Sequence, residues 1–219
     1  GLCKYLSKRK APYNLVEPKE LEKLCGSIHH QGVVAMIDEP EIKQLSSKEI
    51  SLWIKNKQHA ILLDRIGNAN NLGAIVRSAA FFGIKNIIIP DDEAQSSITT
   101  SSYRVAEGGM EFVNIFSTSS SIKLLKDVEG KMVRIGTDLS ARKTVSAIHG
   151  LCKSKCALII LGNEERGISE KVRENCDELV IIPFLGMNEG KSSQVESLNV
   201  AQAASIILYE LSKDEFYRK

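Results

Sequence analysis

From Ala60 onward the chain alternates short apolar runs with segments of helical spacing, and this alternation limits the fold more than any other feature. The runs are continuous in Ile, Leu and Val, which is typical of strands buried on both faces. Strands are expected at 60–63, 86–90, 111–115, 132–136, 157–161 and 179–183. Helices must then cover both faces of the sheet. The sequence therefore predicts an α/β fold with a mostly parallel sheet.

Helices are expected between these strands and at the end of the chain. The predicted helices are 71–82, 101–108, 119–128, 169–176 and a closing helix within 197–211. In the closing helix, Val200, Ala203 and Ile207 share one face at helical spacing. The preceding Ser197 and Asn199 suit a helix N-terminus, where backbone N–H groups lack partners. Capping of a core helix and contact with a ligand both explain this polar turn.

The chain before Ala60 has a different character. Residues 1–37 are interpreted as the remnant of a small α/β domain, with a helix at 20–25 and a strand at 32–37. This part is the most basic of the chain, although a solvated helix face also explains such charge. Residues 38–58 are expected to form a linker with one helix, and 59–219 the main domain. Because the chain begins with Gly1 rather than Met, we expect a fragment of a longer protein.

Composition excludes several classes of protein. The 219 residues carry a net charge of +2, so any nucleic-acid site must be a local patch. No apolar run approaches the roughly 20 residues that cross a bilayer, and no signal peptide is recognisable, so we expect a cytoplasmic protein without a membrane span. The five cysteines are odd in number and irregularly spaced, which favours free thiols. No Cys/His pair complements Cys152 and Cys156, so no metal site is predicted.

Three polar loops follow predicted strands, where ligands bind in such folds. The first, 64–78, carries several asparagines and ends near Arg77, which lies about 140° from Leu72 around the helix and so leaves the core face. A solvated arginine and a phosphate contact are both open for Arg77. The second loop, 161–169, fits neither the dinucleotide fingerprint nor the Walker pattern. The third is 182–199.

Taken in order, these loops resemble the three motifs of the SpoU (TrmH-like) family of RNA ribose 2′-O-methyltransferases, within the SPOUT superfamily. The matching residues are 71–77 (NLGAIVR), 162–167 (GNEERG), and 182–183 (IP) with 197–200 (SLNV). The resemblance covers roughly residues 60–211. In addition, 29–35 (HHQGVVA) is similar to the end of the small RNA-binding domain that precedes the catalytic domain in many members.

The resemblance implies a deep trefoil knot at the C-terminus and a homodimer. It also implies S-adenosylmethionine as the cofactor, held largely by backbone groups in the knotted loops. The cofactor-binding residues would be Leu161, Gly162, Ile182, Leu185, Gly186 and Leu198. The implied reaction transfers a methyl group to a ribose 2′-hydroxyl of ribosomal or transfer RNA.

The same resemblance assigns catalytic positions to Arg77, Asn71, Glu164, Ser197 and Asn199. Because a guanidinium is always protonated, Arg77 is expected to stabilise the developing alkoxide and to grip a phosphate rather than to act as a base. Asn71 and Asn199 are expected to order the loops or the arginine. Glu164 is expected to oppose a cationic centre or to orient Arg77.

One segment departs from the family pattern. Residues 188–194 extend the third loop, which is expected to wrap the cofactor. The segment either lengthens the loop without effect, contacts RNA through Lys191, or weakens cofactor binding. A dimeric RNA-binding paralogue that has lost methyl transfer is therefore the alternative function. An unrelated small-molecule enzyme would require all three motifs to be coincidental.

Overall fold

The computed structural model describes residues 1–38, 41–91, 95–184 and 197–217, with side chains up to Lys213. The chain divides into two compact units, Gly1–Glu41 and Ile42–Lys219. The helix predicted within 38–58 is present as α3 (Ser47–Lys55). It belongs to the second unit, because Trp53 is buried there and packs edge-on against Phe116, with ring centroids 5.5 Å apart.

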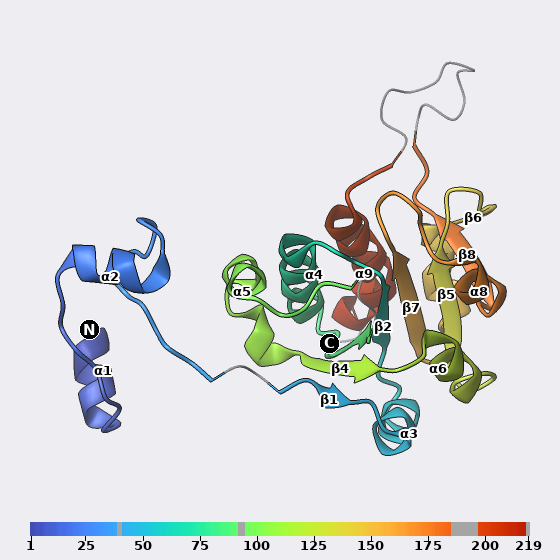
Figure 1. Cartoon of the computed structure of the whole chain (residues 1–219). Coiled ribbons are helices and arrows are strands. Elements are labelled where there is room, and N and C mark those ends of the chain that lie inside the picture. Colours follow the sequence, from blue (N-terminus) through green and yellow to red (C-terminus); the bar gives the residue numbers. More distant parts are fainter. Residues whose placement is uncertain (39–40, 92–94, 185–196, 218–219) are drawn as a thin grey trace. The chain divides into compact units, whose positions relative to one another are not determined.

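The second unit contains one sheet in which every described pairing is parallel (Figure 1). Its strands are β1 (Lys43–Gln44), β2 (Ala60–Asp64), β3 (Asn86–Pro90), β4 (Asn114–Thr118), β5 (Val133–Thr137), β6 (Lys143–Thr144), β7 (Ala157–Gly162) and β8 (Glu178–Ile181). Their order across the sheet is β1-β4-β3-β2-β7-β5-β8-β6. Central β2 and β7 are buried along their whole length, as their continuous apolar sequences predict.

Helices cover both faces of this sheet. They are α3, α4 (Ala69–Phe81), α5 (Thr100–Ala106), α6 (Ser121–Asp127), α7 (Ile148–Leu151), α8 (Glu170–Glu174) and α9 (Val200–Tyr217), with 3-10 helices η1 (Gly109–Phe112) and η2 (Val145–Ala147). Alternate residues of β2 enter different cores. Ile61 packs in the core shared with α4 and α9, whereas Leu62 packs in the core shared with α3, α6 and α8. The predicted α/β fold with a mostly parallel sheet is confirmed.

Two predicted strands differ from the structure. The strand expected at 111–115 begins three residues later, because Gly108, with φ of 85°, turns the chain into η1. The strand expected at 32–37 is not formed, and these residues have no regular secondary structure. Met36 is 90% exposed, and no strand forms among the described residues of this unit with which the apolar run could pair.

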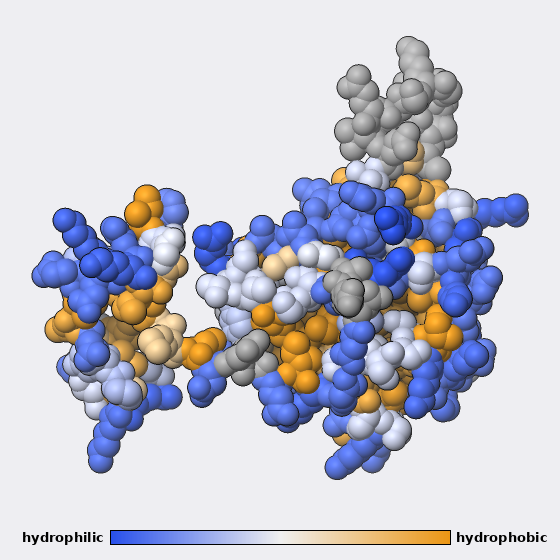
Figure 2. Space-filling model, in the orientation of Figure 1, coloured by the Kyte–Doolittle hydropathy of each residue, from blue (hydrophilic) through white to orange (hydrophobic). Residues whose placement is uncertain are grey.

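The first unit contains α1 (Leu2–Lys8) and α2 (Pro18–Cys25), the second of which starts at a proline and ends before left-handed Gly26. None of its described residues is buried. Figure 2 shows hydrophobic side chains gathered on the visible surface of this unit. The unit therefore has no enclosed core among its described residues. In the described part of the whole chain, no helix is long and apolar enough to cross a membrane.

Candidate functional site

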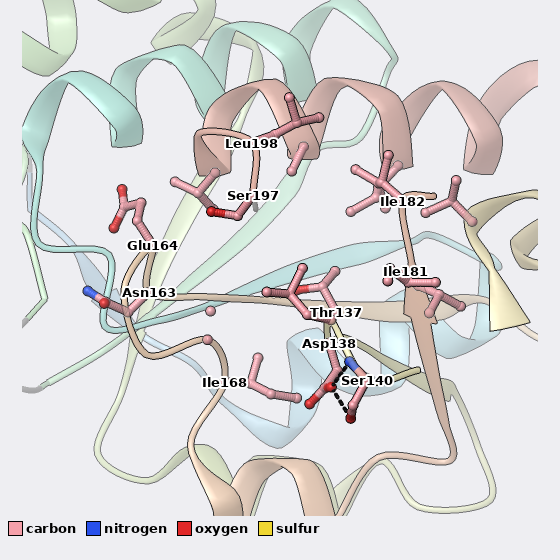
Figure 3. Close-up of a pocket in the computed structure, with 18 of the residues that line it drawn as sticks. Thr137, Asp138, Ser140, Asn163, Glu164, Ile168, Ile181, Ile182, Ser197 and Leu198 are labelled. Atoms are coloured by element: carbon pink, nitrogen blue, oxygen red, sulfur yellow. Dashed lines mark hydrogen bonds between the residues drawn. The ribbon is translucent and has the colours of Figure 1, made fainter. Parts of the chain in front are cut away.

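A cavity of about 540 Å³ opens at the carboxyl ends of β5, β7 and β8. Ligands in parallel α/β sheets bind at this edge, and the volume falls within the range of about 300–1,000 Å³ common for cofactor sites. The lining residues come from 137–145, 162–168, 180–184 and 197–207. Figure 3 shows Glu164 and Ile182 on opposite sides of the cavity, with Ser197 between them in this view. The second and third predicted loops therefore meet here.

The second loop is a closed turn organised by Asn163. Backbone N–H and C=O groups of Asn163 and Gly167 exchange hydrogen bonds of 3.1 and 2.8 Å. The Asn163 side-chain Oδ1 accepts from the N–H groups of Glu165 and Arg166, at 2.9 and 3.2 Å. Its Nδ2 donates to the carbonyl of Arg65 at 3.1 Å, which ties this turn to the end of β2. This hydrogen bond attaches the turn to the first loop.

A chain of side-chain hydrogen bonds joins all three predicted motifs. Asn71, at the start of α4, donates through Nδ2 to Oε1 of Glu164. Asn199 donates through Nδ2 to Oδ1 of Asn71 at 3.0 Å. The Oδ1 of Asn199 then accepts from the N–H of Ala201 at 2.9 Å and caps α9. The polar turn before the closing helix therefore both caps the helix and contacts the site.

The residues predicted to hold a cofactor fall into three groups. Those that line the cavity are Gly162, Ile182 and Leu198. Leu161 is buried one residue deeper in β7 and does not line the cavity. Leu185, Gly186 and the 188–194 segment lie outside the described residues.

Arg77 does not join the other predicted catalytic residues. Its side chain is 56% exposed and leaves the core face of α4, as its helical position predicts. Its Nη2 lies 2.8 Å from Oε2 of Glu107, at the end of α5. Of the predicted catalytic residues, Glu164 and Ser197 line the cavity, whereas Asn71, Asn199 and Arg77 are not among its lining residues.

Sequence comparison supplies the family. Residues 58–209 match the model of the SpoU rRNA Methylase family, which is well over half of the chain. The chain belongs to the SpoU rRNA Methylase family. Residues 1–43 match a second model, described as RNA 2′-O ribose methyltransferase substrate binding.

Relatives of this SpoU-family chain cover most of its length. The 23S rRNA (guanosine-2′-O-)-methyltransferase RlmB of Acinetobacter baylyi is 32% identical over 87% of this chain and 73% of its own length. An uncharacterized tRNA/rRNA methyltransferase of Mycobacterium avium is 30% identical over 89% of this chain and 60% of its own. The crystal structure of SpoU methyltransferase AviRb from Streptomyces viridochromogenes, in complex with AdoMet, aligns with a TM-score of 0.62 and 27% identity. That alignment covers 74% of this chain and 62% of AviRb.

Sequence reasoning missed one wall of the cavity in this SpoU-family domain. Thr137, Asp138 and Ser140 line it at the end of β5. Asp138 Oδ1 accepts from the N–H and the hydroxyl of Ser140, at 2.7 and 2.5 Å, as drawn in Figure 3. Arg173 of α8 reaches the same loop, with Nε 3.2 Å from Asp138 Oδ2. The sequence signal that could have indicated these residues was their position, because 137–140 directly follows a predicted parallel strand.

The cysteines of this SpoU-family chain are free thiols. Burial raises the pKa of Cys152 to about 11 and that of Cys176 to about 12, so both are neutral near pH 7. Neither lines the cavity. Among the described residues, no cluster of three or more His, Cys, Asp or Glu side chains could hold a metal ion.

Proposed function

We propose that this chain binds S-adenosylmethionine in the cavity and transfers the methyl group to a ribose 2′-hydroxyl of RNA. The hydrogen-bond chain from Asn199 through Asn71 to Glu164 carries the proposal, because it joins the three family motifs at one cavity. The AviRb structure is a complex with the same cofactor, and RlmB is named for the same reaction type on 23S rRNA.

The cavity fits a cofactor held by backbone groups between apolar walls. At Gly162, a Cβ atom would lie only 2.2 Å from the carbonyl carbon of Gly167, so a side chain has no room there. The cavity walls around the backbone of this turn include the apolar side chains of Val145, Ile168 and Ile207. Such walls exclude water and suit the faces of a flat aromatic ring, while the turn presents backbone hydrogen-bonding groups to its polar edge. Gly162, Ile182 and Leu198 would hold the cofactor.

When bound, S-adenosylmethionine supplies a methyl group on a positively charged sulfur. The ribose O2′ forms a bond to the methyl carbon as the carbon–sulfur bond breaks, and the hydroxyl proton is released to solvent. Positioning supplies much of the rate in such transfers. In this chain the positioning falls to Asn71, Glu164 and Asn199, whose hydrogen bonds hold the loops, and to Ser197 at the cavity wall. Arg77 does not line the cavity of its own chain, so we propose that it supplies positive charge for a phosphate and for the developing alkoxide only once RNA is bound beside it.

A homodimer is the assembly that best explains the exposed apolar side chains of α4 and α9. Phe81 is 82% exposed and Tyr209 is 52% exposed. Phe82 bridges them, with ring centroids 5.0 Å from Phe81 and 6.4 Å from Tyr209. Phe81 lies one helical turn beyond Arg77, so the two share a face of α4. A second copy docked on this patch would lie beside Arg77.

The dimer is tested by light scattering on the wild type and on Phe81→Glu. We expect a wild-type mass of twice 24.2 kDa and a monomer for the variant. A matched control is Leu52→Glu, which introduces the same charge at an exposed apolar residue of α3, a helix that packs in the core on the other face of the sheet. A monomeric wild type at micromolar concentration would remove the dimer from the proposal.

The finer features of the family complete the proposal. We infer a C-terminal trefoil knot from the match of residues 58–209 to the SpoU rRNA Methylase family, whose resemblance implied it. When the chain is unfolded by pulling on its ends, a tightened knot would make its extended length shorter than that of an unknotted chain of 219 residues.

Residues 1–37 would be part of the RNA-binding domain, in agreement with the substrate-binding match over 1–43. A cytoplasmic location agrees with free thiols, which persist in reducing compartments.

The central test measures cofactor binding and transfer separately. Calorimetry with S-adenosylmethionine is expected to show binding, and tritiated methyl groups are expected to appear in unmodified ribosomal or transfer RNA transcripts. Digestion of the product should place the label on a ribose 2′-oxygen. A folded protein that binds RNA but not the cofactor would instead establish the RNA-binding paralogue, for which the extended third loop is the distinguishing feature.

A further inference from the structure

The acidic partner of Arg77 occupies an unusual backbone position. Glu107 follows α5 with φ of 45° and ψ of 50°, in the left-handed region. Glycine is the usual residue at such a helix end, because any side chain there adds about 1 kcal/mol of strain. The next two residues are glycines, yet the position that contacts Arg77 is a glutamate. Lys10, Gln31, Lys57 and Arg65 also have positive φ, so the strain does not by itself distinguish Glu107, but its contact with Arg77 does.

Close backbone packing fixes the separation of Glu107 from Arg77. A Cβ on Gly109 would lie 3.1 Å from the Cα of Arg77, so η1 rests directly on the backbone of α4 at that residue. At the start of α4, a Cβ on Gly73 would lie 2.4 Å from the carbonyl oxygen of Ser102 in α5. The α5–η1 segment therefore touches α4 near both ends. Figure 1 shows α5 lying beside α4.

The Glu107–Arg77 ion pair contributes little to stability. Both side chains are more than half exposed, at 61% and 56%, and pairs of this kind stabilise by about 0–1 kcal/mol. That gain is no larger than the strain of about 1 kcal/mol at the Glu107 backbone. Stability alone therefore does not explain a glutamate at this position.

We propose that Glu107 is a positioning residue for Arg77, an inference that rests on the proposed methyl transfer. Among the described residues, Glu107 is the partner that the Arg77 guanidinium contacts, through a single nitrogen. A guanidinium has five N–H donors, so the other donors stay available for a phosphate and for the developing alkoxide. The carboxylate limits the rotamers of a long side chain and directs those donors. Arg77 without Glu107 keeps its charge but loses its fixed direction.

The test compares Glu107→Gly with Glu107→Gln and with the control Glu111→Gln. Glu111 lies on exposed η1, and its substitution removes the same charge four residues away. Glu107→Gly is expected to unfold at the same or a higher temperature, because glycine relieves the strain. It is also expected to lower kcat about 2- to 5-fold, the equivalent of an exposed ion pair, with unchanged affinity for S-adenosylmethionine. The kcat of Glu107→Gln should fall between those of Glu107→Gly and the wild type. The kcat of Glu111→Gln should match that of the wild type.

A double-mutant cycle separates positioning from a general effect. In an Arg77→Ala background, Glu107→Gly should cause no further loss, because the group that it directs is gone. An equal loss in both backgrounds, or a wild-type rate in Glu107→Gly, overturns the proposal. A faster rate or tighter RNA binding in Glu107→Gly also overturns it, since Glu107 would then mask Arg77 from RNA.

Failure of methyl transfer itself is recognised independently. If the wild type transfers no methyl group, the proposed function fails, and RNA affinity still reports on Arg77. Fluorescence anisotropy with unmodified ribosomal RNA transcripts should then show binding weakened about 2- to 5-fold in Glu107→Gly. Unchanged RNA affinity under those conditions overturns the positioning role.

Discussion

Replacement of Gly162 by alanine should damage both stability and cofactor binding. The new Cβ would lie 2.2 Å from the carbonyl carbon of Gly167 and 2.2 Å from the nitrogen of Ile168. Carbon contacts are comfortable at about 3.5–4.0 Å, so the second loop must move by at least about 1 Å. Overpacking of this kind destabilises by about 1–3 kcal/mol. Disruption of the paired Asn163–Gly167 hydrogen bonds adds about 1 kcal/mol, which gives about 2–4 kcal/mol in total.

The same movement displaces the turn that lines the cavity, so the affinity for S-adenosylmethionine should fall at least about tenfold, or about 1.4 kcal/mol. Gly150→Ala is the matched control. Gly150 lies in α7 with no heavy atom within 4 Å of the added Cβ, and alanine there favours the helix by up to about 1 kcal/mol. The two variants differ in the contacts of the new methyl group and not in its chemistry.

Thermal unfolding and calorimetry together decide the outcome. For a chain of this size, about 2–4 kcal/mol corresponds to a fall in Tm of about 5–15 °C. Gly150→Ala should unfold at or above the wild-type temperature and bind the cofactor normally. If Gly162→Ala behaves like Gly150→Ala in both measurements, the close packing of Gly162 against the Gly167 backbone does not shape this cavity.

Three further outcomes follow from individual contacts. Asn199→Ala removes the hydrogen bond to Asn71 and the cap of α9, so urea unfolding should show a loss of about 1–2 kcal/mol, and an unchanged midpoint would refute the cap. Asp177→Asn leaves the buried charge of Arg134 poorly compensated and should destabilise by about 1–3 kcal/mol, a value reduced because Asp177 is partly exposed. The hydrogen bond from Arg134 lowers the pKa of Asp177, so this stabilisation is complete above about pH 4 and is lost as the pH falls through the lower folded pKa. Urea unfolding of both proteins between pH 7 and pH 2 should show the difference shrinking. Burial raises the pKa of Cys176 to about 12, so iodoacetamide at pH 8 should modify it, by mass spectrometry, only after denaturation.

The central sheet could be predicted from sequence because its strands are short apolar runs in a repeating pattern. Ala60–Asp64 and Ala157–Gly162 were located within a residue of their observed bounds. The edge strands Lys43–Gln44 and Lys143–Thr144 are two residues long and polar, so they carry no periodic signal. They form because a neighbouring strand offers free hydrogen-bonding groups, which is a tertiary effect.

The site was only partly accessible from sequence. Motif resemblance identified Asn71, Glu164 and Asn199, and the structure joins them by hydrogen bonds. It could not show that Arg77 pairs with Glu107, because neither the helical angle of Arg77 nor the motif specifies what lies opposite it. That contact depends on how α5 packs against α4, which follows from close glycine contacts rather than from a local pattern.

Stability and binding geometry depend on different parts of this structure. The strand register pairs Asp64 with Gly162, so β2 and β7 end at the same level and their loops begin side by side. Apolar burial holds the strands but does not fix the loops beyond them. Polar contacts do so: Asp64 accepts from the N–H of Ser169 at 2.7 Å, and Asn163 donates to the carbonyl of Arg65. Substitutions in the apolar core therefore act mainly on unfolding, whereas substitutions in these polar contacts act mainly on the shape of the cavity.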